Sequence, residues 1–194
     1  MSKRNKNLWI TEIQNTANIF NVKAPELFYV LNDKAVNEVD GMYSNIALDL
    51  QLHISECIKV CISINSEIRV SETGYTLHGL QHSFNVIDLM GQLIKDKNCI
   101  TVLEIGFLIF SALLHDIGMI RIRDEDISPE KIRKNHGKRS ADFIKNNIIK
   151  TDSNNTLNFG KYDILFKQYL PDLCRSHMED FSYILDFPSI SYII

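Results

Sequence analysis

A histidine and an aspartate stand side by side at the end of an apolar run, His115 and Asp116 in the segment from Phe110 to Gly118. Two ionisable groups at the end of a buried helix cost free energy unless something compensates them. A divalent metal ion does so, because neutral imidazole and carboxylate are both among its ligands. Taken alone, the pair is better explained as a helix-terminal histidine followed by a capping aspartate.

The rest of the chain strengthens the metal hypothesis, because three further histidines stand on other segments: His82, His136 and His177. On a helix, His82 shares a face with Val86, Leu89 and Leu93, so its side chain is expected to point inward. A single histidine on an apolar face is more often a hydrogen-bonded core residue. Three such positions around a His-Asp pair favour a metal site.

Helical periodicity dominates the sequence and strand-like alternation is scarce, which predicts an all-α fold. Residues 1–23 have little apolar periodicity and are expected to form a tail or a docking arm. Residues 24–194 are expected to form one helical domain. The expected helices are Pro25–Val36, Asn45–Glu67, Gly79–Lys95, Thr101–Ile117, Pro129–Ile149 and Ile164–His177.

Composition narrows the range of functions. The chain has 194 residues and a net charge of −3, which gives no general reason to expect nucleic-acid binding. The longest apolar stretch, Leu103 to Leu114, is shorter than the roughly 20 residues that span a bilayer, so it is expected to be a core helix and not a membrane anchor. The four cysteines lack a regular framework and are interpreted as reduced, mostly buried thiols of a cytoplasmic protein.

The motifs resemble those of the HD superfamily, an all-α group of metal-dependent phosphohydrolases and phosphodiesterases. The phrase from Leu113 to Gly118, Leu-Leu-His-Asp-Ile-Gly, is similar to the core motif of that family, and the segment from His82 to Val86 resembles its first histidine helix. The wider pattern is most similar to a bacterial subgroup found with conflict or signalling systems, sometimes beside ATPase modules like those of heat-shock chaperones. The resemblance implies an HD-domain-like helical bundle.

The resemblance also implies a ligand set. His82, His115 and Asp116 would be metal ligands, His136 and His177 would be the extra histidines of members with two metals, and Asp116 would bridge both ions as the central catalytic carboxylate. Such a pair of ions lowers the pKa of a bound water and holds phosphoryl oxygens. One or two divalent transition metal ions are expected, and mixed His/Asp ligation suits Mn, Fe, Zn, Co or Ni alike.

Other polar residues have two interpretations each. Arg139 could bind a substrate phosphate or lie on a solvated helix face. His78 could touch substrate, orient a ligand, or be a surface histidine without a role. Lys138 is expected on the surface, and His53 is expected to be structural. No protein partner is indicated.

One family element is missing. HD enzymes normally supply a last aspartate from a later helix, and Asp180 and Asp186 are the only candidates after His177. The chain is therefore expected to be cut short at its C-terminus, or to complete the site with a substitute ligand. Two functions stay open: hydrolysis of a small, nucleotide-like phosphoester, and a catalytically inactive HD-like module that serves as a sensor or interaction domain. A purely structural metal site is the weakest alternative, because such sites are usually closed by cysteines at short spacing.

Overall fold

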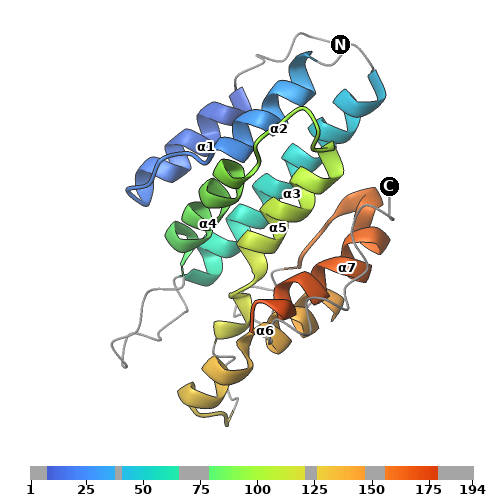
Figure 1. Cartoon of the computed structure of the whole chain (residues 1–194). Coiled ribbons are helices and arrows are strands. Elements are labelled where there is room, and N and C mark those ends of the chain that lie inside the picture. The colour runs from blue at the N-terminus through green and yellow to red at the C-terminus, as the bar shows by residue number, and fades with distance from the viewer. Residues whose placement is uncertain (1–7, 38–40, 66–78, 121–125, 147–155, 179–194) are drawn as a thin grey trace.

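The computed structural model describes residues 8–37, 41–65, 79–120, 126–146 and 156–178. Over these ranges the chain is all-α and contains no strand, as the sequence predicts (Figure 1). In chain order the elements are α1 (Leu8–Ile19), α2 (Glu26–Asn37), α3 (Gly41–Asn65), α4 (Leu80–Leu93), α5 (Val102–Leu114), the 3-10 turn η2 (Ile117–Met119), α6 (Pro129–Asn146), the 3-10 turn η3 (Gly160–Tyr162) and α7 (Asp163–Ser176).

Helix α5 is the centre of the fold. It begins at a capping box, in which the Thr101 hydroxyl accepts a hydrogen bond from the Glu104 amide at 3.2 Å and the Glu104 carboxylate accepts one from the Thr101 amide at 2.8 Å. Ten of its 13 residues are buried, because α3, α4 and α7 all pack against it. The window Val102–Met119 is long and apolar enough to cross a bilayer, but 78% of it is buried inside the protein, as in a core helix.

The N-terminal part of the chain, which the sequence predicts to be a tail or a docking arm, contains a helix in its described part. Helix α1 places Ile10, Ile13 and Ala17 in the hydrophobic core. The Trp9 indole donates a hydrogen bond to the Ser55 hydroxyl on α3 at 2.9 Å. The described part of residues 1–23 is therefore packed on the core, where the partly buried Trp9, Phe20 and Val22 add to these contacts.

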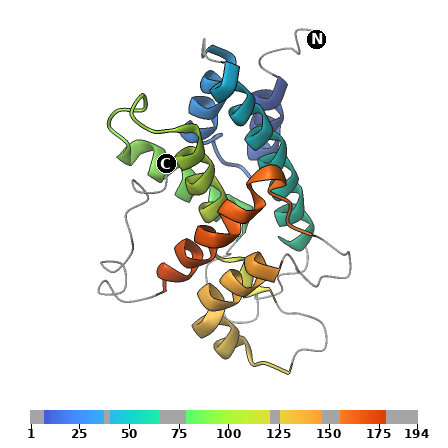
Figure 2. The same cartoon turned by 90° about the vertical axis from the view of Figure 1, so that its right-hand side faces the viewer.

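Helices α6 and α7 pack against each other, and α6 lies at the end of the molecule remote from α1 in both views (Figures 1 and 2). A cluster of aromatic rings joins α7 to α5. The centroid of the fully buried Phe166 ring lies 4.5 Å from that of Phe107 and 5.0 Å from that of Phe110. These contacts hold the first part of α7 against the middle of α5.

Most helix bounds agree with the sequence prediction to within a few residues. The largest difference is the start of α3 at Gly41, four positions before the expected Asn45. Residues 66–67 and 147–149, at the expected ends of two helices, lie outside the described residues.

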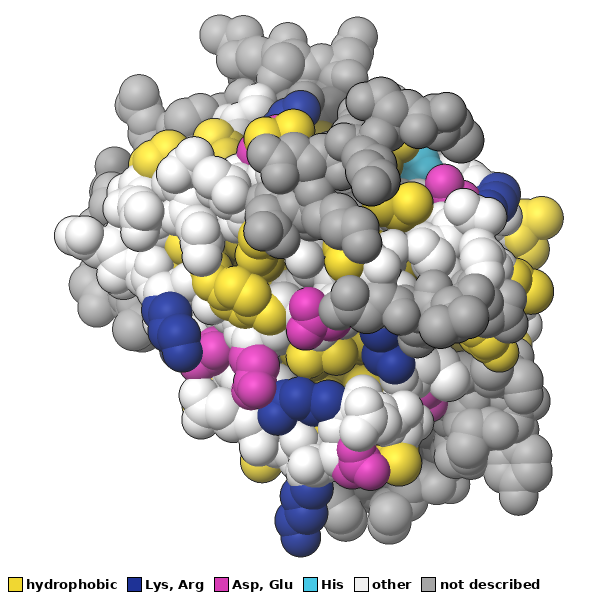
Figure 3. Space-filling model, turned by 90° about the horizontal axis from the view of Figure 1, so that it is seen from above, with side chains coloured by type: hydrophobic (Ala, Val, Ile, Leu, Met, Phe, Trp, Pro, Cys, Tyr) yellow, Lys and Arg dark blue, Asp and Glu magenta, His cyan; other side chains and the backbone are white. Residues whose placement is uncertain are grey.

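On the face seen from above, positive and negative side chains lie beside one another and do not gather by sign (Figure 3).

Candidate metal centre

Four helices and one turn bring four histidines and one aspartate together. The first turn of α4 carries His82, and α5 ends just before His115 and Asp116. The buried face of α6 carries His136, and His177 follows the last residue of α7. The structure thus brings together all five residues that the resemblance implies as ligands.

The five residues form two overlapping triads that share Asp116. We call them the His82 half-site and the His136 half-site, and in each the possible ligand atoms all lie within 4.8 Å of one another. Their members are His82, His115 and Asp116 in the first, and Asp116, His136 and His177 in the second.

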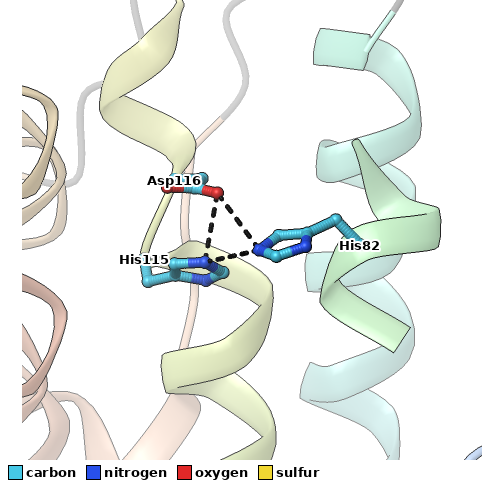
Figure 4. A group of neighbouring side chains, drawn as sticks. All are labelled: His82, His115 and Asp116. Carbon is cyan, nitrogen blue, oxygen red and sulfur yellow. Dashed lines mark hydrogen bonds and ion pairs between the residues drawn. The ribbon is translucent and has the colours of Figure 1, made fainter. Parts of the chain in front are cut away.

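In the His82 half-site, three atoms point toward a common centre (Figure 4). The Nε2 atoms of His82 and His115 are 3.2 Å apart. One carboxylate oxygen of Asp116, Oδ2, lies 3.1 Å from His115 Nε2 and 3.5 Å from His82 Nε2.

In the His136 half-site, the other carboxylate oxygen of Asp116 faces the two histidines. Asp116 Oδ1 lies 3.0 Å from His136 Nε2 and 3.6 Å from His177 Nε2. The two Nε2 atoms are 2.9 Å apart. Asp116 therefore presents one oxygen to each pair of histidines.

The other ring nitrogen of three histidines is bound to the backbone of its own helix. His115 Nδ1 contacts the Ala112 carbonyl at 3.0 Å, and the Nδ1 atoms of His136 and His177 each contact the carbonyl three residues earlier at 2.5 Å. A carbonyl oxygen only accepts, so Nδ1 carries the hydrogen, and Nε2 of the neutral ring is a bare lone pair.

This tautomer makes the His136 half-site a site for a cation. Two bare Nε2 atoms and a carboxylate oxygen face one another, and in the neutral rings no hydrogen is left to place between them. A proton or a metal ion bound between them removes the repulsion of the three lone pairs. In the His82 half-site, His82 Nε2 can also donate to His115, so an ordinary hydrogen bond satisfies that pair as well.

The separations fit metal ligands. Ligand atoms at about 2.1 Å from an ion are about 3.0 Å apart at right angles and about 3.4 Å apart in a tetrahedron. The separations in both half-sites, from 2.9 to 3.6 Å, lie around these values. The donor set of imidazole and carboxylate suits a divalent transition metal.

The electrostatics agree with a site that attracts cations. Burial alone would raise the pKa of Asp116, but hydrogen bonds that the protonated rings of His115, His136 and His177 donate to it hold the pKa of that carboxyl far below its usual range. Burial opposes protonation of His136, but the hydrogen bonds that its protonated ring donates to Asp116 and to the Arg133 carbonyl outweigh burial and raise the pKa of His136. The carboxylate is therefore charged, and His136 attracts a proton when no other cation is bound.

Access to the site differs between its members. The side chains of Asp116, His115 and His136 are 9%, 13% and 8% exposed, whereas those of His82 and His177 are 42% and 28% exposed. The first three form the floor of the site, and the last two form its rim.

Two thiols contact the end of the helix that carries the site. The partly buried Cys61 donates to the Leu113 carbonyl at 3.6 Å, and the buried Cys174 donates to the Ser111 carbonyl at 3.8 Å. Both carbonyls belong to the last turn of α5, and the Ser111 carbonyl also accepts from the His115 amide. Burial raises the pKa of the Cys174 thiol, so this cysteine stays protonated and acts as a donor.

Two glycines allow the elements to approach closely enough to form the site. A Cβ atom on Gly118 would lie 2.1 Å from the His136 carbonyl oxygen and 2.6 Å from the Ser140 amide nitrogen. A Cβ atom on Gly137 would lie 2.9 Å from Met178 Cγ and 3.3 Å from the His177 ring. The sequence shows Gly118 as the end of a helix, but nothing in it reveals that α6 lies against this residue.

The helix-face prediction for His82 was wrong in detail. The buried face of α4 consists of Leu80, Ser83, Phe84, Ile87 and Gly91. Leu89 and Leu93, the expected neighbours of His82 in the core, are 58% and 81% exposed. His82 reaches the site because it lies in the first turn, where a side chain leans toward the N-terminal end of its helix.

The remaining candidates have different outcomes. Arg139 is half-buried and donates to the Gly118 and Ile120 carbonyls, both at 2.8 Å. It does not lie on a solvated helix face, and these two bonds do not direct it toward a phosphate. Lys138 is exposed. His53 lies on α3, bonded to Glu56 at 3.2 Å and packed beside Gly160. His78, like the aspartates expected after His177, lies outside the described residues.

Replacing His82 with alanine is expected to weaken divalent metal binding at least tenfold, whereas replacing His53 is expected to leave it within about twofold of wild type. His82 supplies an Nε2 lone pair to its half-site, while His53 contacts Glu56 and packs beside Gly160 at the start of η3. Titration with Co²⁺, followed by visible absorption, measures both effects. Equal losses in the two variants would exclude His82 as a ligand.

Comparison with known proteins agrees with this geometry. The HD-CE family model matches residues 72–192, which is more than half of the chain and includes all five clustered residues. No curated protein matches the chain, and no solved structure does. The family match and the buried His/Asp cluster both fit an HD-type metal-dependent hydrolase. The chain belongs to the HD-CE family.

Proposed function

We propose that the protein is a divalent-metal-dependent phosphohydrolase or phosphodiesterase acting on a small, nucleotide-like phosphoester. The observation that carries the proposal is the single buried carboxylate of Asp116, which presents one oxygen to each of two histidine pairs. Two cations bound in this way would share Asp116. When bound, such ions activate water and neutralise charge on a phosphoryl group.

The residues of the chain have distinct parts in this proposal. Asp116 is the catalytic carboxylate, since it supplies the negative charge that holds the cations beside each other. His115 and His136 form the buried floor that limits access of bulk water, and His82 and His177 form the rim at which a phosphoester arrives. No protein nucleophile is required for hydrolysis of this kind.

Two residues are proposed to take part in substrate recognition. Arg139, which donates to the Gly118 and Ile120 carbonyls, is proposed to influence the phosphate through its charge. His78 is proposed as a further substrate contact. The net charge of −3 supports a small substrate over nucleic acid, and four free cysteines support a cytoplasmic location.

A second candidate function is a catalytically inactive module that binds metal and acts as a sensor or an interaction domain. The observation that favours it is the number of carboxylates. Among the described residues, Asp116 is the one acidic ligand in both half-sites. HD enzymes normally have a further aspartate at this site.

Hydrolysis of model phosphoesters distinguishes the two functions. Metal content is first measured on purified full-length protein, and the protein is then assayed with p-nitrophenyl phosphate and bis-p-nitrophenyl phosphate in added Mn²⁺. We expect release of p-nitrophenol that EDTA abolishes and that the His53→Ala variant retains. Bound metal without cleavage of either ester would favour the sensor, and absence of metal binding would overturn both functions.

A further inference from the structure

We propose that Ser140 is the positioning residue that sets the His136 half-site, so that its hydroxyl determines metal affinity there and not at the His82 half-site. The inference rests on the proposed function, because it concerns the same metal ligands. It assigns a role to a serine that contacts no ligand atom of either half-site.

The Ser140 hydroxyl bridges the backbone on both sides of Asp116. Its Oγ atom donates to the His115 carbonyl at 2.6 Å and accepts from the Gly118 amide at 2.8 Å. Ser140 is 0% exposed, so water cannot replace either bond. A hydroxyl has one hydrogen to donate, and here it is used on the residue that directly precedes Asp116.

One face of α6 carries both the proposed ligand His136 and the bridging residue Ser140. His136 and Ser140 are one turn apart on the buried face of α6. The bridge therefore fixes how far α6 stands from the Asp116 backbone, and with it the 3.0 Å separation between His136 Nε2 and Asp116 Oδ1. A serine hydroxyl with two short bonds allows little change in that separation.

The His82 half-site does not depend on α6 in this way. The His115 ring is held by the Ala112 carbonyl inside α5, and Asp116 is the next residue along the chain. His82 comes from α4, which packs against α5. Moving α6 would therefore separate His136 from Asp116 and leave His82 and His115 in place.

Arg139 keeps α6 docked when the hydroxyl is removed. Its guanidinium donates to the Gly118 and Ile120 carbonyls, which follow Asp116 in the chain. The buried side chain of Ile144 on α6 also remains in the hydrophobic core. We therefore expect the Ser140→Ala protein to fold, with a less defined position of its histidine.

Two single variants of the full-length protein serve as backgrounds in which each half-site is measured without the other. His177→Ala leaves the His82 half-site complete, and His82→Ala leaves the His136 half-site complete. Affinity for Co²⁺ is measured in each background, with and without Ser140→Ala, from visible absorption. We expect Ser140→Ala to weaken Co²⁺ binding tenfold or more in the His82→Ala background, as roughly 10- to 100-fold losses are typical for residues that orient ligands.

In the His177→Ala background, the same substitution should change affinity by about twofold or less, as for independent sites. Ser111→Ala is the matched control, because Ser111 is also buried and its hydroxyl donates to the Leu108 carbonyl of its own helix. It should leave affinity unchanged in both backgrounds. Ser140→Thr, which keeps the hydroxyl, should restore affinity in the His82→Ala background.

Equal weakening in both backgrounds, or no weakening in the His82→Ala background, would overturn the role of Ser140 while leaving the metal site intact. Failure of the wild-type protein to bind Co²⁺ would instead overturn the proposed function. If circular dichroism shows that Ser140→Ala is unfolded, Ser140→Cys is measured in its place. Its thiol is a weak donor of similar size. Equal weakening in both backgrounds, or no weakening in the His82→Ala background, would again overturn the role of Ser140.

Discussion

The Asp116→Ala variant is expected to lose metal at both half-sites, with affinity reduced by more than about 100-fold, since even loss of a residue that orients a ligand costs 10- to 100-fold. Asp116 supplies an oxygen to each half-site and is the one carboxylate that their described members contain. Without it, four imidazoles would have to hold divalent cations with no negative charge to offset them. Helical content should stay near that of the wild type, because the aspartate contributes no apolar contact to the core.

Metal analysis after dialysis and Co²⁺ titration measure the effect, and circular dichroism checks the fold. Asp142→Ala is the matched control, since this aspartate lies on α6 but is exposed and outside both half-sites. It should bind metal as the wild type does. Full metal stoichiometry in Asp116→Ala would refute the assignment of this residue as a shared ligand.

The Gly118→Ala variant is expected to be destabilised by about 3 kcal/mol or more, at the upper end of the range for overpacked cores. The added Cβ would lie 2.1 Å from the His136 carbonyl oxygen and 2.8 Å from Arg139 Cβ. The nearest of these atoms belong to the backbone of α6, so the helix as a whole must move away. For a chain of this length, the loss corresponds to a drop in Tm of roughly 6–12 °C.

Thermal unfolding by circular dichroism measures this drop, and Gly41→Ala is the control because a Cβ there would meet nothing within 4 Å. The same variant should bind less metal, since movement of α6 carries His136 away from Asp116. A Gly118→Ala protein with the Tm and metal content of the wild type would show that α6 does not pack tightly on η2.

The sequence was sufficient for the fold class and for the residues of the cluster, because both depend on local signals. The helical period of α5 and its abrupt end in His115 and Asp116 are visible along the chain. The metal-ligand roles themselves stay predictions, although the five residues lie together. Helix α1 was not predicted, because polar residues such as Gln14, Asn15 and Asn18 separate its apolar positions.

The contacts that define the site geometry could not be predicted, because they join distant segments. Ser140 and Gly118 matter only because α6 packs on η2, and a sequence gives no sign of that pairing. His82 lies in the cluster as predicted, but the reason given for its position was wrong. Its position in the first turn of α4, and not an inward-facing stripe, directs it to the site.

Three of the imidazole rings are fastened by Nδ1 to the main chain one turn before them, so each ring is locked to the helix that bears it. These rings therefore do not rotate independently, and the separations of their Nε2 atoms depend on how α5, α6 and α7 pack together. We predict that substitutions in the buried layers between these helices, remote from the cluster, would change which divalent ion the site prefers.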